Sequence, residues 1–71
     1  MQDSTNIKFG KRIKQLRQQQ GVTQEQLAEL IKTSYKYIQR IEGKTPPDIR
    51  LTTIDRIAKA LKTRLFKLFN Y

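Results

Sequence analysis

The side chains that could do chemistry in this sequence are almost all cationic. The 71 residues include 15 lysines and arginines but only 6 aspartates and glutamates, with a net charge of +9 and neither histidine nor cysteine. The six carboxylates show no clustered spacing, and no serine or threonine has an evident base to activate it. The three glycines are too far apart to form a loop that cradles phosphate. This residue supply argues against an enzyme, a metal site or a bound cofactor, and it favours a polyanionic partner.

The basic residues gather in two stretches of the chain. The first has no acidic residue between Ser4 and Gln24, and the second runs through the middle of the sequence. Nucleic acid, an anionic membrane surface or solvent alone could complement such charge, so charge does not choose among them. The residues concerned are Lys8, Lys11, Arg12, Lys14 and Arg17, followed by Lys32, Lys36, Arg40, Lys44 and Arg50.

Length and hydropathy limit the possible architectures. A chain of 71 residues forms one small domain, and without cysteine or histidine its stability depends on helix packing. The longest uninterrupted apolar run is two residues, which is far too short for a transmembrane span or a signal peptide. We therefore expect one soluble domain over residues 1–71, located in the cytoplasm.

The first predicted helix covers roughly residues 6–20. Phe9, Ile13 and Leu16 recur at i, i+4 and i+7, which places one apolar stripe on the helix and leaves the basic residues mostly on its other faces. Gly21 follows as a stop signal, because glycine adopts the left-handed conformation at a helix end without steric cost.

Two short helices are predicted next, with a tight turn between them. Thr23 and Gln26 have the spacing of a capping box, so a helix begins at Thr23 and ends near residue 30 or 31. Ser34 offers another N-cap for a third helix over about residues 34–42. In that helix Ile38 and Ile41 point inward, which leaves a mixed polar and basic face outward.

The rest of the sequence predicts a stiff loop, a fourth helix and a short tail. Pro46 and Pro47 interrupt the helical pattern, because neither donates a backbone hydrogen bond. Thr52 or Thr53 is expected to cap the fourth helix. The tail, residues 64–71, carries more apolar side chains than one short helix normally buries.

The second and third predicted helices have the geometry of a helix-turn-helix, with a tight turn and an exposed polar face on the second member. The internal spacing is the specific part of the signal. The small residue needed where the two helices cross falls at Ala28, four residues after Gln24. The apolar residues of the motif are Leu27, Ile31, Ile38 and Ile41.

Three stretches of the sequence resemble the lambda-repressor-like, Xre/Cro-type helix-turn-helix family: IKQLRQQQGVTQEQLA at residues 13–28, YIQRIEG at residues 37–43 and IAKAL at residues 57–61. The resemblance covers about residues 7–69. It implies an all-α, compact five-helix domain of prokaryotic or phage type that binds double-stranded operator DNA as a homodimer, with no small-molecule ligand. Lys32 stands at the turn position commonly occupied by glycine, so we expect a strained positive φ there.

The resemblance also implies roles for individual residues. Tyr35, Lys36 and Arg40 fall at base-reading positions, with Gln39 adjacent, and the Arg40 guanidinium suits the O6 and N7 atoms of guanine. The residues implied to contact phosphate are Gln24, Ser34, Lys44 and Thr45. The loop after Glu42 departs from the family pattern, with Pro46 and Pro47 before the fourth predicted helix.

Two further sets of residues are expected to be structural. In similar family members the positions of Arg17 and Glu42 form a largely buried ion pair that ties two helices together. The apolar tail is expected to close the core and to supply an interface between two copies of the chain. Phe69 and Tyr71 suit the interface best, whereas Leu65 and Phe66 suit either role.

Two other functions remain open on the sequence alone. One is an antitoxin-type protein-interaction module whose DNA binding is secondary, although such proteins usually need extra chain to wrap their partner. The other is a basic amphipathic membrane binder, which requires a broad exposed apolar face, yet the predicted faces have neighbouring helices to bury them. The sequence therefore favours a DNA-binding regulator, without membrane partners.

Overall fold

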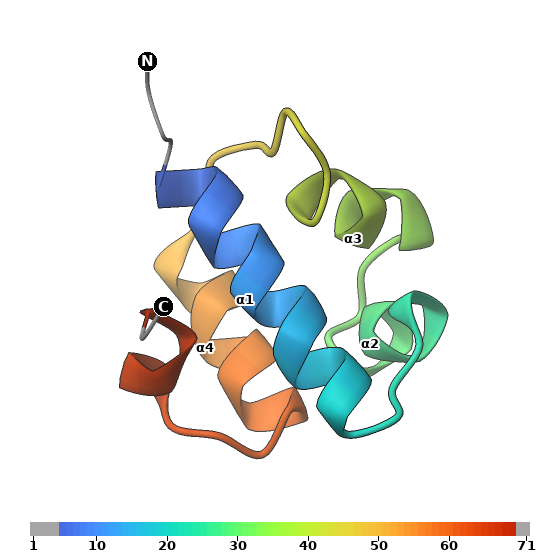
Figure 1. Ribbon diagram of the computed structural model, residues 1–71. Coiled ribbons are helices and arrows are strands. Elements are labelled where there is room, and N and C mark those ends of the chain that lie inside the picture. The colour runs from blue at the N-terminus through green and yellow to red at the C-terminus, as the bar shows by residue number, and fades with distance from the viewer. Residues whose placement is uncertain (1–4, 70–71) are drawn as a thin grey trace.

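The computed structural model describes residues 5–69, which form four α-helices and one 3-10 helix and contain no strand. Figure 1 shows α1 crossing the centre of the molecule, with α2 and α3 on one side and α4 with the 3-10 helix η1 on the other. The expected all-α fold is confirmed, although the fifth helix is of the tighter 3-10 type. The bounds are α1 Thr5–Gln19, α2 Gln24–Leu30, α3 Tyr35–Ile41, α4 Leu51–Ala60 and η1 Leu65–Phe69.

The hydrophobic core draws on every one of these elements. Each element contributes at least one side chain with no exposed surface, and the apolar stripe predicted on α1 lies in this core. Burial of this apolar surface is the main force that holds the small domain together. The fully buried examples, in chain order, are Ile13, Leu27, Ile38, Ile57 and Leu68.

Local signals set the ends of α2 and α3 as the sequence predicted. Thr23 and Gln26 form the reciprocal capping box, with hydrogen bonds of 3.0 and 2.9 Å between side chain and backbone. The Ser34 hydroxyl accepts a hydrogen bond from the backbone N–H of Tyr37 at 3.1 Å. These caps fix where both helices of the motif begin.

Within the described residues 5–69, three have a positive φ. Gly21 ends α1 with a φ of 69°, and the strained turn expected at Lys32 is confirmed by a φ of 58°. Lys62, just after α4, has a φ of 52° that the sequence did not reveal, because no deviation from a known pattern marked it.

The predicted N-cap of the fourth helix is wrong. Helix α4 begins at Leu51, its N-cap is Arg50, and no side chain forms a capping hydrogen bond. The Thr52 and Thr53 hydroxyls therefore lie inside the first turn. The backbone hydrogen bond from the Ile54 N–H to the Arg50 carbonyl, 3.0 Å long, closes that turn without a side-chain cap.

One residue of the tail closes the core, as expected for part of this segment. Leu68 is fully buried and closes the core, whereas Leu65 and Phe66 are exposed, because the 3-10 turn directs only one of its apolar side chains inward. The Phe69 ring stacks on Phe9 of α1 with a centroid distance of 5.3 Å and remains 42% exposed. Tyr71 lies outside the described residues. No helix within residues 5–69 has the length and apolarity that crossing a membrane requires.

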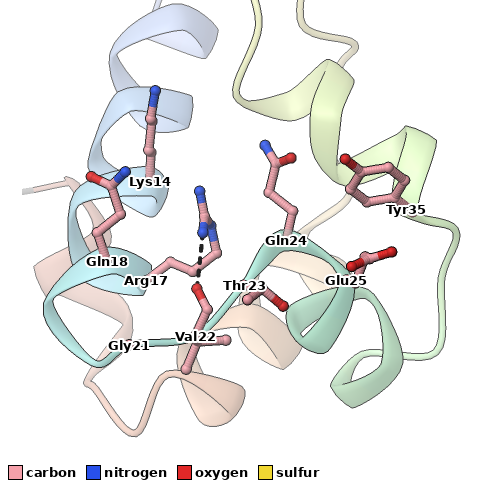
Figure 2. A pocket seen from close by; sticks show the side chains of 9 residues that line it. All are labelled: Lys14, Arg17, Gln18, Gly21, Val22, Thr23, Gln24, Glu25 and Tyr35. Carbon is pink, nitrogen blue, oxygen red and sulfur yellow. Dashed lines mark hydrogen bonds between the residues drawn. The ribbon is translucent and has the colours of Figure 1, made fainter.

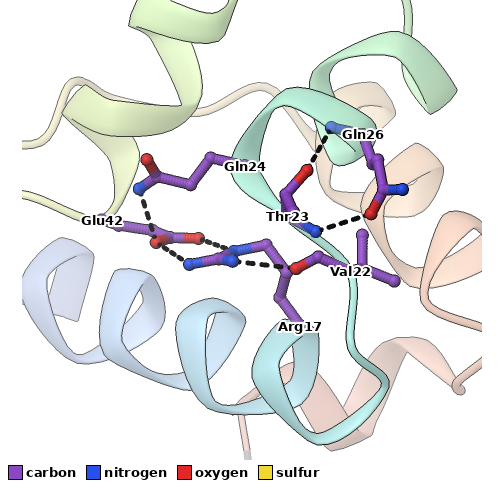
Figure 3. Close-up of polar contacts among 6 residues, drawn as sticks. All are labelled: Arg17, Val22, Thr23, Gln24, Gln26 and Glu42. Carbon is purple, nitrogen blue, oxygen red and sulfur yellow. Dashed lines mark hydrogen bonds and ion pairs between the residues drawn. The ribbon is translucent and has the colours of Figure 1, made fainter.

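The contact between α1 and α3 includes a buried ion pair. Arg17 donates two hydrogen bonds of 2.8 Å to the Glu42 carboxylate, and the two side chains are only 9% and 2% exposed. A third donor of the guanidinium reaches the Val22 carbonyl at 2.9 Å, across the turn that follows α1 (Figures 2 and 3). The hydrogen bonds to Glu42 raise the pKa of the Arg17 guanidinium, while burial opposes this rise.

A glycine in the middle of α1 makes the same contact possible. A Cβ atom added at Gly10 would lie 2.0 Å from the Ile41 carbonyl oxygen and 3.3 Å from the Glu42 Cα. Because these are backbone atoms, no side-chain movement relieves the overlap. Gly10 therefore sets how closely the C-terminal end of α3 approaches α1.

Removal of one partner of the ion pair should destabilise the fold strongly. We expect Glu42→Ala to lower the free energy of unfolding by about 3–5 kcal/mol, because Arg17 would remain buried and unpaired. Urea unfolding measures this change. Asp55→Ala is the control, since it removes an exposed ion pair with Lys59 and should cost less than about 1 kcal/mol. Equal stability of the two variants would contradict the structural role of the pair.

Gly10→Ala should also destabilise the protein, although alanine has the higher helix propensity. Alanine in a helix interior normally gains about 0.5–1 kcal/mol over glycine. Here we expect a net loss of about 1–3 kcal/mol, because the new methyl group forces α1 away from α3. Lys11→Ala, at an exposed position on the same helix, is the control. Thermal unfolding that shows Gly10→Ala to be more stable than the parent would refute the close-contact argument.

Candidate nucleic-acid interface

Helix α3 carries the residues predicted to read bases, and it is anchored from beneath. Ile38 and Ile41 are fully buried. Successive residues in a helix are about 100° apart, so the side opposite these isoleucines points into solvent. That side carries the recognition face, which we define as Tyr35, Lys36, Gln39 and Arg40; all four are exposed.

The loop after α3 extends the recognition face. Lys44 and Thr45, predicted as phosphate contacts, line one shallow depression together with Lys36, Gln39 and Arg40. The structure thus brings residues from both predicted sets onto one surface. Gly43 lies between them and completes the turn.

The opposite side of the recognition face borders a second depression, between the end of α1 and the start of α2. Figure 2 shows Lys14 and Gln18 on α1, with Gln24 of α2 and Tyr35 of α3 across from them. Lys14 belongs to the first basic stretch of the sequence, and its position beside Gln24 and Tyr35 is apparent only in the structure. The turn at Gly21 folds α2 back beside α1, and no single-helix pattern predicts that juxtaposition.

Gln24 has a partner that the sequence did not predict. Its side-chain N–H donates a hydrogen bond of 2.9 Å to the Glu42 carboxylate, which also binds Arg17 (Figure 3). The start of α2 is therefore connected to the end of α3 through the ion pair. One N–H and the carbonyl oxygen of the Gln24 amide remain for a further partner.

Lys36, Arg40 and Lys44 have no counter-ion among the described residues. Within residues 5–69 the ion pairs are those of Arg17 with Glu42 and of Lys59 with Asp55. Lys36, Arg40 and Lys44 take part in neither, so the charge of the surface is not neutralised from within. The described part of the chain also contains no group of three or more side chains suited to bind a metal ion.

Two solved structures of restriction-modification controller proteins are similar to this chain. C.AhdI from Aeromonas hydrophila is 33% identical, with a TM-score of 0.84 over 90% of this chain and 96% of that protein. A mutant of C.Esp1396I is 26% identical, with a TM-score of 0.85 over 99% of this chain and 87% of the other.

A third structure shows the same fold at lower identity. The clp gene regulator ClgR from C. glutamicum is 19% identical, with a TM-score of 0.89 over 97% of this chain and 88% of that one. A sequence comparison with curated proteins finds no match.

The family model described as helix-turn-helix matches residues 13–68, which span α2, α3 and α4 in full. This match agrees with the capped α2–α3 pair and with the outward recognition face. The chain therefore belongs to the lambda-repressor-like, Xre/Cro-type helix-turn-helix family of DNA-binding transcription regulators.

Proposed function

We propose that this protein binds a short, two-fold symmetric DNA operator as a homodimer and thereby regulates transcription. The observation that carries the proposal is the recognition face of α3, which is exposed and cationic and forms no ion pair with any residue of the described range 5–69. Two similar structures are of restriction-modification controller proteins, which favours a regulator of controller type.

The side chains of the recognition face match the groups on base edges in the major groove. The Arg40 guanidinium has the fork geometry that binds guanine O6 and N7, and Lys36 meets the same acceptors as a point charge. Gln39 suits adenine, and Tyr35 either donates its hydroxyl or packs on a thymine methyl group. We assign base reading to these four residues.

Phosphate contacts position the protein on the duplex without reading its sequence. We assign them to residues around the recognition face, where helix starts and the loop after α3 offer N–H and hydroxyl groups. The Ser34 hydroxyl already caps α3, so its role is to present the start of that helix. The residues assigned are Gln24, Ser34, Lys44 and Thr45.

The exposed part of the tail supports dimer formation. We define the C-terminal apolar patch as Leu65, Phe66 and Phe69, which are 41%, 63% and 42% exposed. We infer an interface here because three large apolar side chains remain exposed within one five-residue segment. We assign Phe69 and Tyr71 to this interface, together with Phe66.

Selection of bound sequences from random duplexes tests the function directly. We expect a palindromic motif to be enriched at two salt concentrations. Equal binding of every duplex would reduce the protein to a nonspecific nucleic-acid binder.

Two single variants separate base reading from phosphate binding. Arg40→Ala should relax the preference at one base position and cost about 1–3 kcal/mol of binding free energy. Lys44→Ala should weaken binding to all sequences alike and reduce the salt slope by about one unit. Binding titrations at several salt concentrations distinguish the two patterns. Uniform weakening by Arg40→Ala would remove Arg40 from the base-reading set.

A charge placed in the C-terminal apolar patch should separate the subunits. We expect Phe66→Lys to shift the protein from dimer to monomer in sedimentation experiments without loss of folding, because Phe66 is mostly exposed. Leu30→Lys is the matched control, since Leu30 is 58% exposed but lies on α2. A dimer that is unaffected by Phe66→Lys, or one disrupted by Leu30→Lys, would move the interface elsewhere.

A further inference from the structure

A third depression lies between the α2–α3 turn and the start of α4, and its lining is rich in positive charge. Its volume is about 300 Å³, at the small end of the range for ligand pockets. We call it the Lys32 groove. The lining residues that matter here are Lys32, Thr33, Tyr37, Arg50, Thr53 and Arg56.

The chemistry of this lining suits a phosphate group. The lining contains three cationic side chains and, in addition, the hydroxyl groups of two threonines and a tyrosine. All of these groups can donate hydrogen bonds to the oxygens of a phosphate. Within residues 5–69, Lys32, Arg50 and Arg56 form no ion pair. The one carboxylate in the lining, Asp48, accepts a hydrogen bond of 3.1 Å from the Asn6 side chain.

The Lys32 groove also lies beside α3, where a DNA strand would pass if α3 entered the major groove. Tyr37 lines it, whereas Tyr35 lines the depression beside α1. Because residues in a helix are about 100° apart, Tyr35 stands at one edge of the recognition face and Tyr37 lies beyond the opposite edge. A helix about 10–12 Å across fills a major groove about 12 Å wide, so the two DNA strands pass along both flanks.

The backbone at Lys32 shows that a side chain is present where glycine would be easier to accommodate. Its φ of 58° is unfavourable for a residue with a Cβ atom. Lys62 has nearly the same conformation, with a φ of 52°, but does not line the groove. The chain thus contains two lysines with equal strain and different surroundings.

We propose that the Lys32 groove binds a backbone phosphate of the DNA strand on the α4 side of the recognition face, through Lys32, Arg50 and Arg56. This inference rests on the proposed function, and it adds three phosphate contacts on the flank opposite to Gln24. Phosphate contacts on both flanks would fix the rotation of α3 in the major groove of the DNA.

The test compares Lys32→Gly with Lys62→Gly. Each variant removes one positive charge and relieves one strained backbone position, so both should remain folded with similar or higher melting temperatures. We expect Lys32→Gly to weaken binding several-fold to every duplex alike and to reduce the slope of log affinity against log salt by about one unit. Lys62→Gly should retain the affinity and the slope of the parent.

A second pair of variants tests another cation of the groove. Arg56→Gln should behave like Lys32→Gly, whereas Arg64→Gln, exposed and outside the groove, should behave like Lys62→Gly. If neither groove variant differs from its control while Arg40→Ala still relaxes base preference, the groove inference fails and the proposed function stands. If the parent binds no duplex at any salt concentration, both fail.

A further experiment asks whether the Lys32 groove binds a phosphate of the DNA backbone or a free phosphate ion, with inorganic phosphate as the probe. Melting temperatures are measured in phosphate and in chloride at equal ionic strength. Suppose phosphate stabilises the parent and Lys62→Gly but not Lys32→Gly, while Lys32→Gly binds DNA like the parent. That result would overturn the assignment to the DNA backbone and identify a site for a free anion.

Discussion

The contact between α1 and α3 determines where the recognition face points, and it depends on the buried pair of Arg17 with Glu42. Apolar packing of Ile38 and Ile41 sets which side of α3 faces the core. The ion pair, in addition, holds the end of that helix against α1. The planar guanidinium binds its carboxylate in a fixed geometry and so adds direction. Gly10 allows the backbones to approach closely enough for this pairing.

The same pair connects the two helices of the motif. Gln24 donates to Glu42, so α1, α2 and α3 meet at one carboxylate. In a domain of 71 residues the core is small. Each buried polar contact therefore contributes strongly to fixing how the helices pack against one another. A polar network of this kind rigidifies a structure when all its members are hydrogen-bonded. Among the described residues no buried side-chain polar atom lacks a partner.

Most of the fold could be predicted from the sequence because its signals are local. Capping at Thr23 and Ser34, the stop at Gly21 and the apolar spacing of α1 and α3 each involve residues close together in the chain. The recognition face followed from the same spacing, since residues that avoid the core side of a helix must be exposed. The strained turn at Lys32 was predictable because it breaks a familiar pattern.

The features that sequence analysis missed depend on distant parts of the chain. The start of α4 has no side-chain cap and follows from the path of the preceding loop. For this reason the prediction that Thr52 or Thr53 caps this helix was wrong. Gln24 meets Glu42 only after the helices pack. Likewise, the 3-10 geometry of the tail decides that Leu68 is buried and Phe66 is not. No periodicity in one short segment contains that information.

The helix η1 buries Leu68 in the core and leaves the apolar side chains of Leu65, Phe66 and Phe69 exposed. If subunits associate through this segment, each association event also holds the segment in its folded position. Folding and assembly then become linked equilibria, and the apparent stability of the protein rises with its own concentration. A dilute population would be easier to degrade than a concentrated one, which would sharpen the threshold at which the regulator accumulates.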